Sequence, residues 1–338
     1  MKVVDLSGRA RAAILVVAVL LAGAAGTAYV LRARSQAVRP AAAAVPSARP
    51  APSATALREG DLMAVRAGPA ADSGQVFAVE PGDAGEQRPT GVHCRRFYAA
   101  AGTGLCLRVA TSLATRSEVI VLDRGLREVR KVQLSGIPSR ARVSASGRMA
   151  AWTFFITGDS YVSVGFSTRA GILDTRTGTL VKNLEEFTLV KDGRVYRAAD
   201  LNYWGVTFAA DDNRFYATAS SGGRTYLLQG DFAARRMRVL RENAECPSLS
   251  PDGTRVAYKK RMGGSSDPWR LYTLDLRSGR ETALAETANI DDQAAWLDDG
   301  TVMYGRLRGD SSDVWRVPAD GSGRPRLLLK DASSPVAT

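Results

Sequence analysis

The feature of this 338-residue chain that most constrains its fold is a repeat that begins near Gly60 and continues to the end of the sequence. A turn followed by an alternating strand recurs, most completely as LSPDGTRVAY at residues 249–258. The turn positions of the six copies are Gly60, Gly102, Gly147, Asp212, Gly253 and Gly300. Their spacing is 41 to 47 residues, apart from one interval of 65 residues. Short strands repeated at such a period are typical of a β-propeller.

The second half of each unit has its own pattern, seen clearly in YTLDLRSGRETALA at residues 272–285. A strand ends near an Asp, a turn containing Gly follows, and a further strand completes the unit. Such turns supply the positive φ that tight hairpins need, and the alternation buries one face of each strand. Each unit therefore provides four strands, and the sequence predicts an all-β fold, a six-bladed β-propeller over residues 59–338.

The tail ASSPVAT at residues 332–338 resembles the start of a unit, a segment that the first unit lacks. We expect this tail to pair into the blade formed by residues 60–90, because such a closure protects both free sheet edges.

The N-terminal segment carries a second signal. Residues 12–31 contain no charge and are flanked by arginines on both sides. As a helix they span about 30 Å, the thickness of a bilayer core. We interpret residues 1–11 as a cytoplasmic tail, 12–31 as a transmembrane anchor and 32–58 as an Ala/Pro-rich linker. The alternative is a cleavable signal peptide, since residues 26–28 are small. The body lies outside the cytoplasm in both cases, anchored to the cell membrane or secreted.

The repeat is similar to that of a known family. LSPDGTRVAY, followed by WRLYTLDLRSGRETAL at residues 269–284, resembles the WD40-like repeat of TolB-type propellers. The body as a whole resembles the membrane-anchored TolB-like proteins of actinobacteria. The S-P-D-G element is complete only at residues 250–253 and degenerates in the other units. The resemblance implies a propeller that serves as a protein-interaction module, and it does not imply a role in the Tol translocation machinery.

The 65-residue interval exceeds the others by about twenty residues, which two insertions at residues 155–171 and 185–204 provide. Loops longer than a scaffold needs are common places for binding residues. We expect a recognition surface at one mouth of the propeller channel, although a longer hairpin with ordinary polar tips is an equal alternative. The candidate binding residues are Asp159, Ser160, Tyr161, Arg169, Tyr196, Asp200, Asn202, Tyr203 and Trp204.

Cys94 and Cys106 lie twelve residues apart across the turn between the first two strands of the second unit. A hairpin centred near Ala100 would place them opposite each other, within the range of Cα separations that a disulfide spans. We therefore predict a Cys94–Cys106 disulfide, with two reduced core cysteines as the alternative. Cys246 is left over as a small buried residue.

The net charge of +12 would by itself suggest nucleic-acid binding, so we counted the charge separately for the N-terminal segment and the body. Residues 1–58 carry +7 and the body only +5, with mixed signs, so we predict no nucleic-acid binding. The sequence has three Cys and one His and lacks paired ligand spacings, so we predict no metal site and no cofactor.

No catalytic motif stands out: there is no G-x-S-x-G elbow, and His93 is the only histidine. Asp pairs occur at residues 211–212, 291–292 and 298–299, and because two of them stand at the repeat's turn position, we favour a structural role over cation binding or acid–base catalysis. We predict a non-enzymatic, monomeric binding or scaffold module at the cell envelope whose partner is a protein, peptide or glycan. The alternative is an extracytoplasmic hydrolase or lyase that uses acidic residues at the channel.

Overall fold

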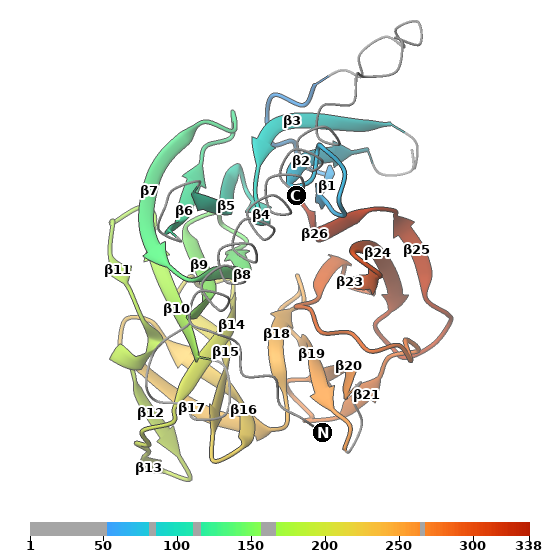
Figure 1. The fold of residues 1–338 in the computed structure, drawn as a ribbon. Helices are drawn as coiled ribbons and strands as arrows, with labels where there is room; N and C mark the ends of the chain where they lie inside the picture. The colour runs from blue at the N-terminus through green and yellow to red at the C-terminus, as the bar shows by residue number, and fades with distance from the viewer. Residues whose placement is uncertain (1–52, 81–85, 111–115, 157–166, 264–267) are drawn as a thin grey trace, which may run out of the picture. The chain divides into compact units, whose positions relative to one another are not determined.

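The computed structural model describes residues 53–80, 86–110, 116–156, 167–263 and 268–338. These residues form six sheets arranged as blades around a central axis, and all neighbouring strands are antiparallel except β12 and β17 (Figure 1). The predicted six-bladed β-propeller is thus confirmed. The predicted anchor at residues 12–31 lies outside the described residues, and within them no helix has the length and apolar character needed to cross a bilayer.

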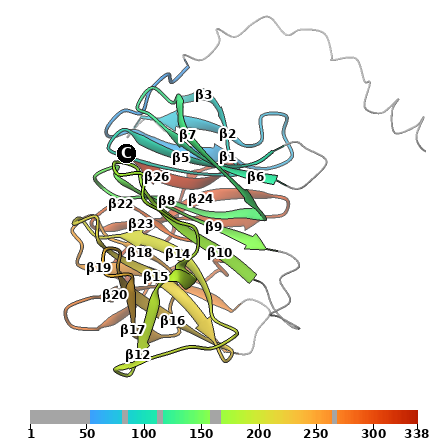
Figure 2. The ribbon, with the colours of Figure 1, turned by 90° about the vertical axis from the view of Figure 1, so that its left-hand side faces the viewer.

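Blades 1 to 3 have four strands each. Blade 1 consists, from the axis outward, of β26 (Ala332–Ala337), β1 (Leu62–Arg66), β2 (Gln75–Val79) and β3 (Gln87–His93). Blade 2 consists of β4 (Arg96–Ala100), β5 (Thr103–Ala110), β6 (Arg116–Leu122) and β7 (Glu128–Ser135). Blade 3 consists of β8 (Ile137–Val143), β9 (Met149–Ile156), β10 (Ser167–Asp174) and β11 (Leu180–Val181). Figure 2 shows β8, β9 and β10 side by side.

Blade 4 is larger than the others. It consists of β14 (Asn202–Phe208), β15 (Arg214–Ser221), β16 (Arg224–Asp231), β17 (Arg236–Glu242), β12 (Thr188–Lys191) and β13 (Arg194–Val195). Blade 5 consists of β18 (Glu245–Leu249), β19 (Arg255–Arg261), β20 (Trp269–Asp275) and β21 (Glu281–Ala283). Blade 6 consists of β22 (Ala295–Asp298), β23 (Thr301–Arg308), β24 (Ser311–Pro318) and β25 (Arg326–Leu329).

The turn of the S-P-D-G element joins the first two strands of a blade. In blade 5 the Ser250 hydroxyl accepts a hydrogen bond from the Arg255 amide, and the Gly253 amide donates to the Ser250 carbonyl. Gly253 adopts a φ of 70°, where a residue with a β-carbon is strained. Blade 3 repeats the arrangement with Ser144 and Gly147. In blades 3 and 5 the repeated sequence therefore encodes the same turn geometry, which sets the start of the second strand.

The hydrophobic core lies between neighbouring blades. Trp152 and Phe154 of β9 are buried in a cluster with residues of blade 2, whereas Phe215 of β15 lies in a cluster with residues of blade 3. Adjacent innermost strands also approach closely. A β-carbon at Gly205 would lie 2.9 Å from the Cα atom of Cys246, so only glycine fits there. Packing of this kind fixes the innermost strands, and with them the walls of the channel.

The tail of the chain closes the ring as predicted. β26 pairs with β1 in an antiparallel register, with Met63 opposite Val336 and Arg66 opposite Ala332. The packed body also begins before residue 59, because Ala54 and Leu57, at the end of the predicted linker, are buried.

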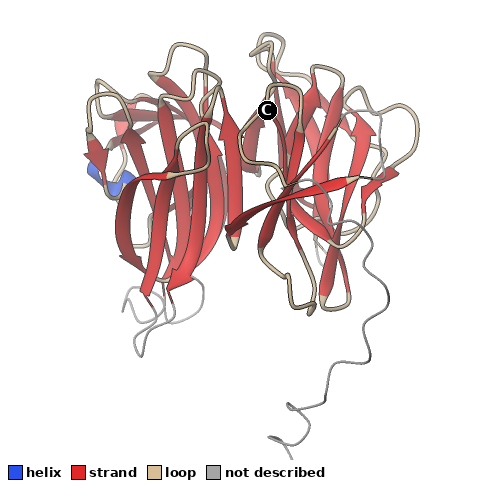
Figure 3. Cartoon of the chain, turned by 90° about the horizontal axis from the view of Figure 1, so that it is seen from above, coloured by secondary structure: helices blue, strands red, loops and turns tan. Residues whose placement is uncertain are grey.

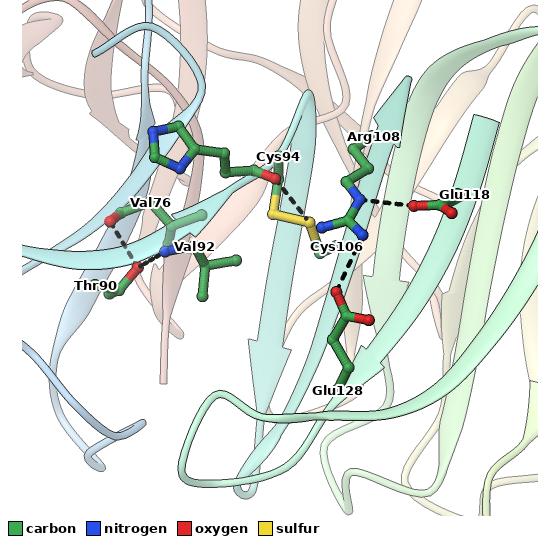
Figure 4. The surroundings of a disulfide bond; sticks show 9 residues. Val76, Thr90, Val92, Cys94, Cys106, Arg108, Glu118 and Glu128 are labelled. Atoms are coloured by element: carbon green, nitrogen blue, oxygen red, sulfur yellow. Dashed lines mark hydrogen bonds and ion pairs between the residues drawn. A yellow bond between two sulfur atoms is a disulfide. The ribbon is translucent and has the colours of Figure 1, made fainter. Parts of the chain in front are cut away.

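A disulfide joins Cys94 to Cys106, with their Cα atoms 5.4 Å apart (Figure 4). The register differs from the expected one, because Cys106 of β5 lies opposite Phe97 rather than Cys94. Cys94 precedes β4, where the chain passes from blade 1 to blade 2. The bond therefore fastens the junction between two blades, and not two facing positions of one hairpin.

We expect free-thiol counting on the unfolded, unreduced protein to find one thiol, that of Cys246, which is buried in the folded state. Reduction should raise the count to three and lower the melting temperature, since a crosslink across about a dozen residues contributes about 3 kcal/mol in the chain-entropy model. Three thiols before reduction would contradict the disulfide.

Candidate functional site

The described end of the first insertion, at residues 167–169, lies beside the second insertion. Residues 157–166 of the first insertion lie outside the described residues, and with them Asp159, Ser160 and Tyr161. The second insertion forms a short 3-10 helix, η1 (Leu184–Glu186), followed by β12 and β13. β12 pairs in parallel with β17, the fourth strand of blade 4. Figure 3 shows η1 at the periphery of the sheets.

This placement corrects the expectation of a surface at a channel mouth. β12 and β13 extend blade 4 outward, so the second insertion builds the rim of the propeller. The physical reason is that the edge of β17 offers unpaired backbone groups, and a strand inserted before blade 4 satisfies them. The expectation failed because repeat spacing counts extra residues but does not say which sheet edge they join.

A pocket of about 720 Å³ lies at this rim, and we call it the rim pocket. Its walls are the start of β10, η1, β12, β13 and the segment of residues 196–203. Of the predicted binding residues, the rim pocket brings together Arg169, Tyr196, Asp200, Asn202 and Tyr203. Trp204 does not line it and is buried within blade 4.

The segment of residues 196–201 is held by two side chains that bind the β15–β16 turn. Asp200 accepts hydrogen bonds from the Ser221 hydroxyl at 2.7 Å and the Gly222 amide at 2.6 Å. Tyr196 and Ser221 share a hydrogen bond of 2.9 Å between their hydroxyls. The Gly222 amide and the Ser221 hydroxyl hold the pKa of Asp200 below its usual value. This wall of the rim pocket is therefore fixed before any ligand arrives.

The inner wall of the rim pocket joins blade 3 to blade 4. The Asn202 amide oxygen accepts hydrogen bonds from the backbone amide and the hydroxyl of Thr168, at 2.9 and 2.6 Å. The Thr168 hydroxyl also lies 2.7 Å from the Tyr203 carbonyl. Tyr203 is only 3% exposed, and burial raises the pKa of its hydroxyl. Tyr203 thus forms part of the wall and the core, rather than an exposed anchor.

The central channel is a separate feature whose residues the sequence analysis did not single out. It opens through a mouth of about 730 Å³ on the face of the S-P-D-G turns and through a recess of about 670 Å³ on the opposite face. Between them lies a cavity of about 30 Å³, which shares Tyr98 and Arg142 with the mouth and Arg96 and Asp292 with the recess. We call this cavity the constriction.

Three arginines line the constriction: Arg96 of β4, and Arg140 and Arg142 of β8. A guanidinium nitrogen of Arg96 lies 3.6 Å, and one of Arg140 3.5 Å, from the same oxygen of Asp292. Arg142 donates a hydrogen bond of 2.9 Å to the Ala294 carbonyl and lies over the Tyr98 ring. Burial lowers the pKa of Arg96, although arginine stays charged. The sequence signal that could have revealed these arginines is R-x-R at residues 140–142. Two residues apart on a strand, both side chains lie on one face of the sheet.

The paired aspartates have structural contacts. Asp211 accepts hydrogen bonds from the Asn213 and Arg214 amides, and Asp298 accepts one from the Gly300 amide. Asp291 forms an ion pair with Lys259 in the channel. Burial opposes ionisation of Asp291, but Lys259 nevertheless holds its pKa below the usual value.

No protein-family model matches the chain. Its fold is similar to that of TolB from Acinetobacter baumannii, with a TM-score of 0.59 and 16% identity, over 82% of this chain and 66% of the TolB chain. The matched region thus spans slightly less than two thirds of that TolB. A chain of the nidogen/laminin complex is also similar, with a TM-score of 0.54 and 10% identity, over 82% of this chain and 98% of that one. The chain is therefore a six-bladed β-propeller with TolB and other propeller proteins among its structural neighbours.

Proposed function

We propose that this protein is a binding or scaffold module of the cell envelope that recognises a protein, peptide or glycan through the rim pocket. The observation that carries the proposal is the origin of the pocket. About twenty residues beyond the repeat build it, and six closed blades do not require it. A preformed concave site with convergent polar groups is the usual form of a ligand site. The similarity of the fold to that of TolB is compatible with this role.

The proposal includes anchoring through residues 12–31, by their length and lack of charge, with the body outside the cytoplasm. Two properties of the rim pocket favour binding. Its walls carry both amide and charged groups, including Asn183, Glu185 and Arg197, which suits an uncharged or mixed-charge partner. Its hydrogen-bonded walls are already ordered, so little conformational entropy is lost when a partner binds.

We expect Ala199→Trp, which places a large side chain at a lining position, to abolish capture of partners by immobilised residues 51–338, which form one compact unit. The matched control is Ala233→Trp, at an exposed position in the β16–β17 turn of the same blade. The measurement is recovery of envelope proteins and glycans by each variant, with melting temperatures recorded for all three proteins. Equal capture by Ala199→Trp and the wild type, with both folded, would place the site elsewhere.

The alternative of a hydrolase or lyase is tested with the same material. An acid–base mechanism needs a carboxyl group that can exchange a proton near neutral pH. In the channel, burial opposes ionisation of Asp291 but Lys259 holds its pKa below the usual value, and Asp292 forms ion pairs with Arg96 and Arg140. Turnover of peptide or polysaccharide substrates that is lost in an Asp291→Asn, Asp292→Asn double variant would support the alternative over a binding role.

A further inference from the structure

The constriction has a charge imbalance that stands apart from the rim pocket. Four cationic side chains, Arg96, Arg140, Arg142 and Lys259, lie in this part of the channel with three carboxylates, Asp291, Asp292 and Glu245. Lys259 pairs with Asp291 and lies 3.8 Å from Glu245. Asp292 is the carboxylate that forms ion pairs with Arg96 and Arg140, and Asp291 attracts both arginines from a longer distance. Buried charges are normally paired, because removing an ion from water costs several kcal/mol.

The hydrogen bonds of these arginines are also incomplete. The Nε atoms of Arg96, Arg140 and Arg142 are buried and have no hydrogen-bond partner among the described residues. The contacts from Asp292 to Arg96 and Arg140, at 3.6 and 3.5 Å, are longer than the 2.7 to 3.2 Å of an N–H···O hydrogen bond. Arg140 does donate to the Ser139 carbonyl and hydroxyl, at 3.0 and 3.2 Å, and to the Asp291 carbonyl at 3.4 Å. The donors without an acceptor are therefore the three Nε atoms, which belong to residues that line the constriction.

The size of the constriction selects the ligand group. A volume of about 30 Å³ holds about two water-sized groups. A carboxylate presents two oxygens to an arginine fork, whereas a phosphate or sulfate brings four. The mouth of about 730 Å³, which shares Arg142 and Tyr98 with the constriction, has room for the remainder of a ligand. We propose that the constriction is a carboxylate-binding site that takes the acidic end of a ligand entering along the channel.

Two ligand sources share this chemistry, the C-terminal carboxylate of a peptide and the carboxylate of an acidic sugar. The probes are therefore N-acetyl-trialanine and its C-terminal amide, glucuronate and glucose, and inorganic phosphate. Binding to the intact chain is measured by isothermal titration calorimetry at fixed ionic strength, because salt screens exposed charges. We expect at least one carboxylate probe to bind and its neutral counterpart to bind at least tenfold more weakly, with phosphate weaker than the carboxylate. Which carboxylate binds tells the two sources apart.

Two variants act in opposite directions. Arg142→Gln keeps a donor for the Ala294 carbonyl but removes a charge, and should weaken carboxylate binding at least tenfold. Asp292→Asn removes the carboxylate that competes for Arg96 and Arg140, and should tighten binding, which a misfolded protein would not do. The matched control is Arg326→Gln, at an exposed position of β25, which removes the same charge far from the channel and should change nothing.

Equal binding of acid and neutral probes, no binding of any carboxylate, or the same loss in Arg142→Gln and Arg326→Gln would overturn the proposal. So would weaker binding in a folded Asp292→Asn protein. The inference stands independently of the rim pocket, since no residue of the constriction lines it.

Discussion

Deleting residues 333–338 is expected to lower the melting temperature by at least about 8 °C or to prevent folding. These residues form most of β26, the innermost strand of blade 1. Their loss removes Val336 and uncovers Met63 and Val65 of β1, all three of which are at most 2% exposed. At about 1.5–3 kcal/mol for each large apolar side chain, the cost is about 5 kcal/mol or more. Globular domains are stable by about 5–15 kcal/mol, so this single strand supplies a large share of the total.

The deletion also removes hydrogen bonds that fasten the two ends of the body. The Thr338 amide donates to the Asp61 carbonyl at 3.0 Å, and the Gly60 amide donates to the Thr338 carbonyl at 2.6 Å. A synthetic peptide of sequence ASSPVAT, added in trans, should restore the melting temperature in a concentration-dependent way, because it can pair with the freed edge of β1. A deletion variant that melts at the wild-type temperature would show that closure contributes little to stability.

The closure shows what repeat analysis can predict. The sequence shows that the first unit lacks its opening segment and that the tail at residues 332–338 matches such a segment. In the structure the tail fills the vacant strand position beside β1. The turn positions are equally visible, because a residue that tolerates a positive φ, such as Gly253 or Asp212, stands at five of the six. A feature that recurs in several units is supported by each copy in the sequence. The number and order of the blades could therefore be predicted.

The candidate site is less predictable for a definite physical reason. A single insertion has no second copy to compare, and the parallel pairing of β12 with β17 is a non-local contact that periodicity does not report. Tyr203 and Trp204 are among the predicted binding residues, yet both are buried, because they belong to β14, which begins at Asn202. Tyr196 and Asp200 do line the rim pocket, but their bonds to the β15–β16 turn depend on the folded blade.

The arginines of the constriction were missed although their alternation was readable. Arg140 and Arg142 are two residues apart on an innermost strand, so they face the same side of the sheet. Arg96 comes from the neighbouring blade, and Asp292 from the segment that leads into blade 6. Sequence spacing therefore indicates which face a residue occupies within its own blade, whereas convergence across three blades follows only from ring closure.

A second large effect is expected at Asp174, the Asp that ends the third strand of blade 3. Its Oδ1 atom accepts hydrogen bonds from Arg148 Nε at 3.0 Å and from the Arg176 and Thr177 amides at 3.0 and 3.2 Å. Its Oδ2 atom lies 2.6 Å from Arg148 Nη2. Asp174 is 2% exposed. Its partner Arg148 directly follows Gly147, in the turn between the first two strands of the blade. Asp174 thus ties both turns of the blade together on one face of the propeller.

We expect Asp174→Asn to lower stability at pH 7 by about 3 kcal/mol, toward the low end for broken buried pairs because Arg148 remains partly exposed. For a body of this size the corresponding fall in melting temperature is about 5 °C. The matched control is Asp275→Asn. Asp275 occupies the same position in blade 5, where it accepts hydrogen bonds from the Arg277 and Ser278 amides and has no comparable bidentate arginine partner among its described contacts. The Asp275→Asn control should therefore lose less stability than Asp174→Asn.

The pH dependence separates the ion pair from general damage to the turn. The hydrogen bonds from Arg148 hold the pKa of Asp174 well below its usual value, and hydrogen bonds from Thr177 and from the Arg176 amide contribute less. Between that lowered pKa and the unfolded value of about 3.9, the unfolded chain binds the proton more readily than the native protein does. The stabilisation is therefore complete above about pH 4 and is lost as the pH falls below it. Melting curves at pH 7, 5, 4 and 3 should show the difference between wild type and Asp174→Asn narrowing only below pH 4. A difference that stays constant down to pH 3 would mean that Asp174 acts through turn geometry, and that its charge contributes nothing.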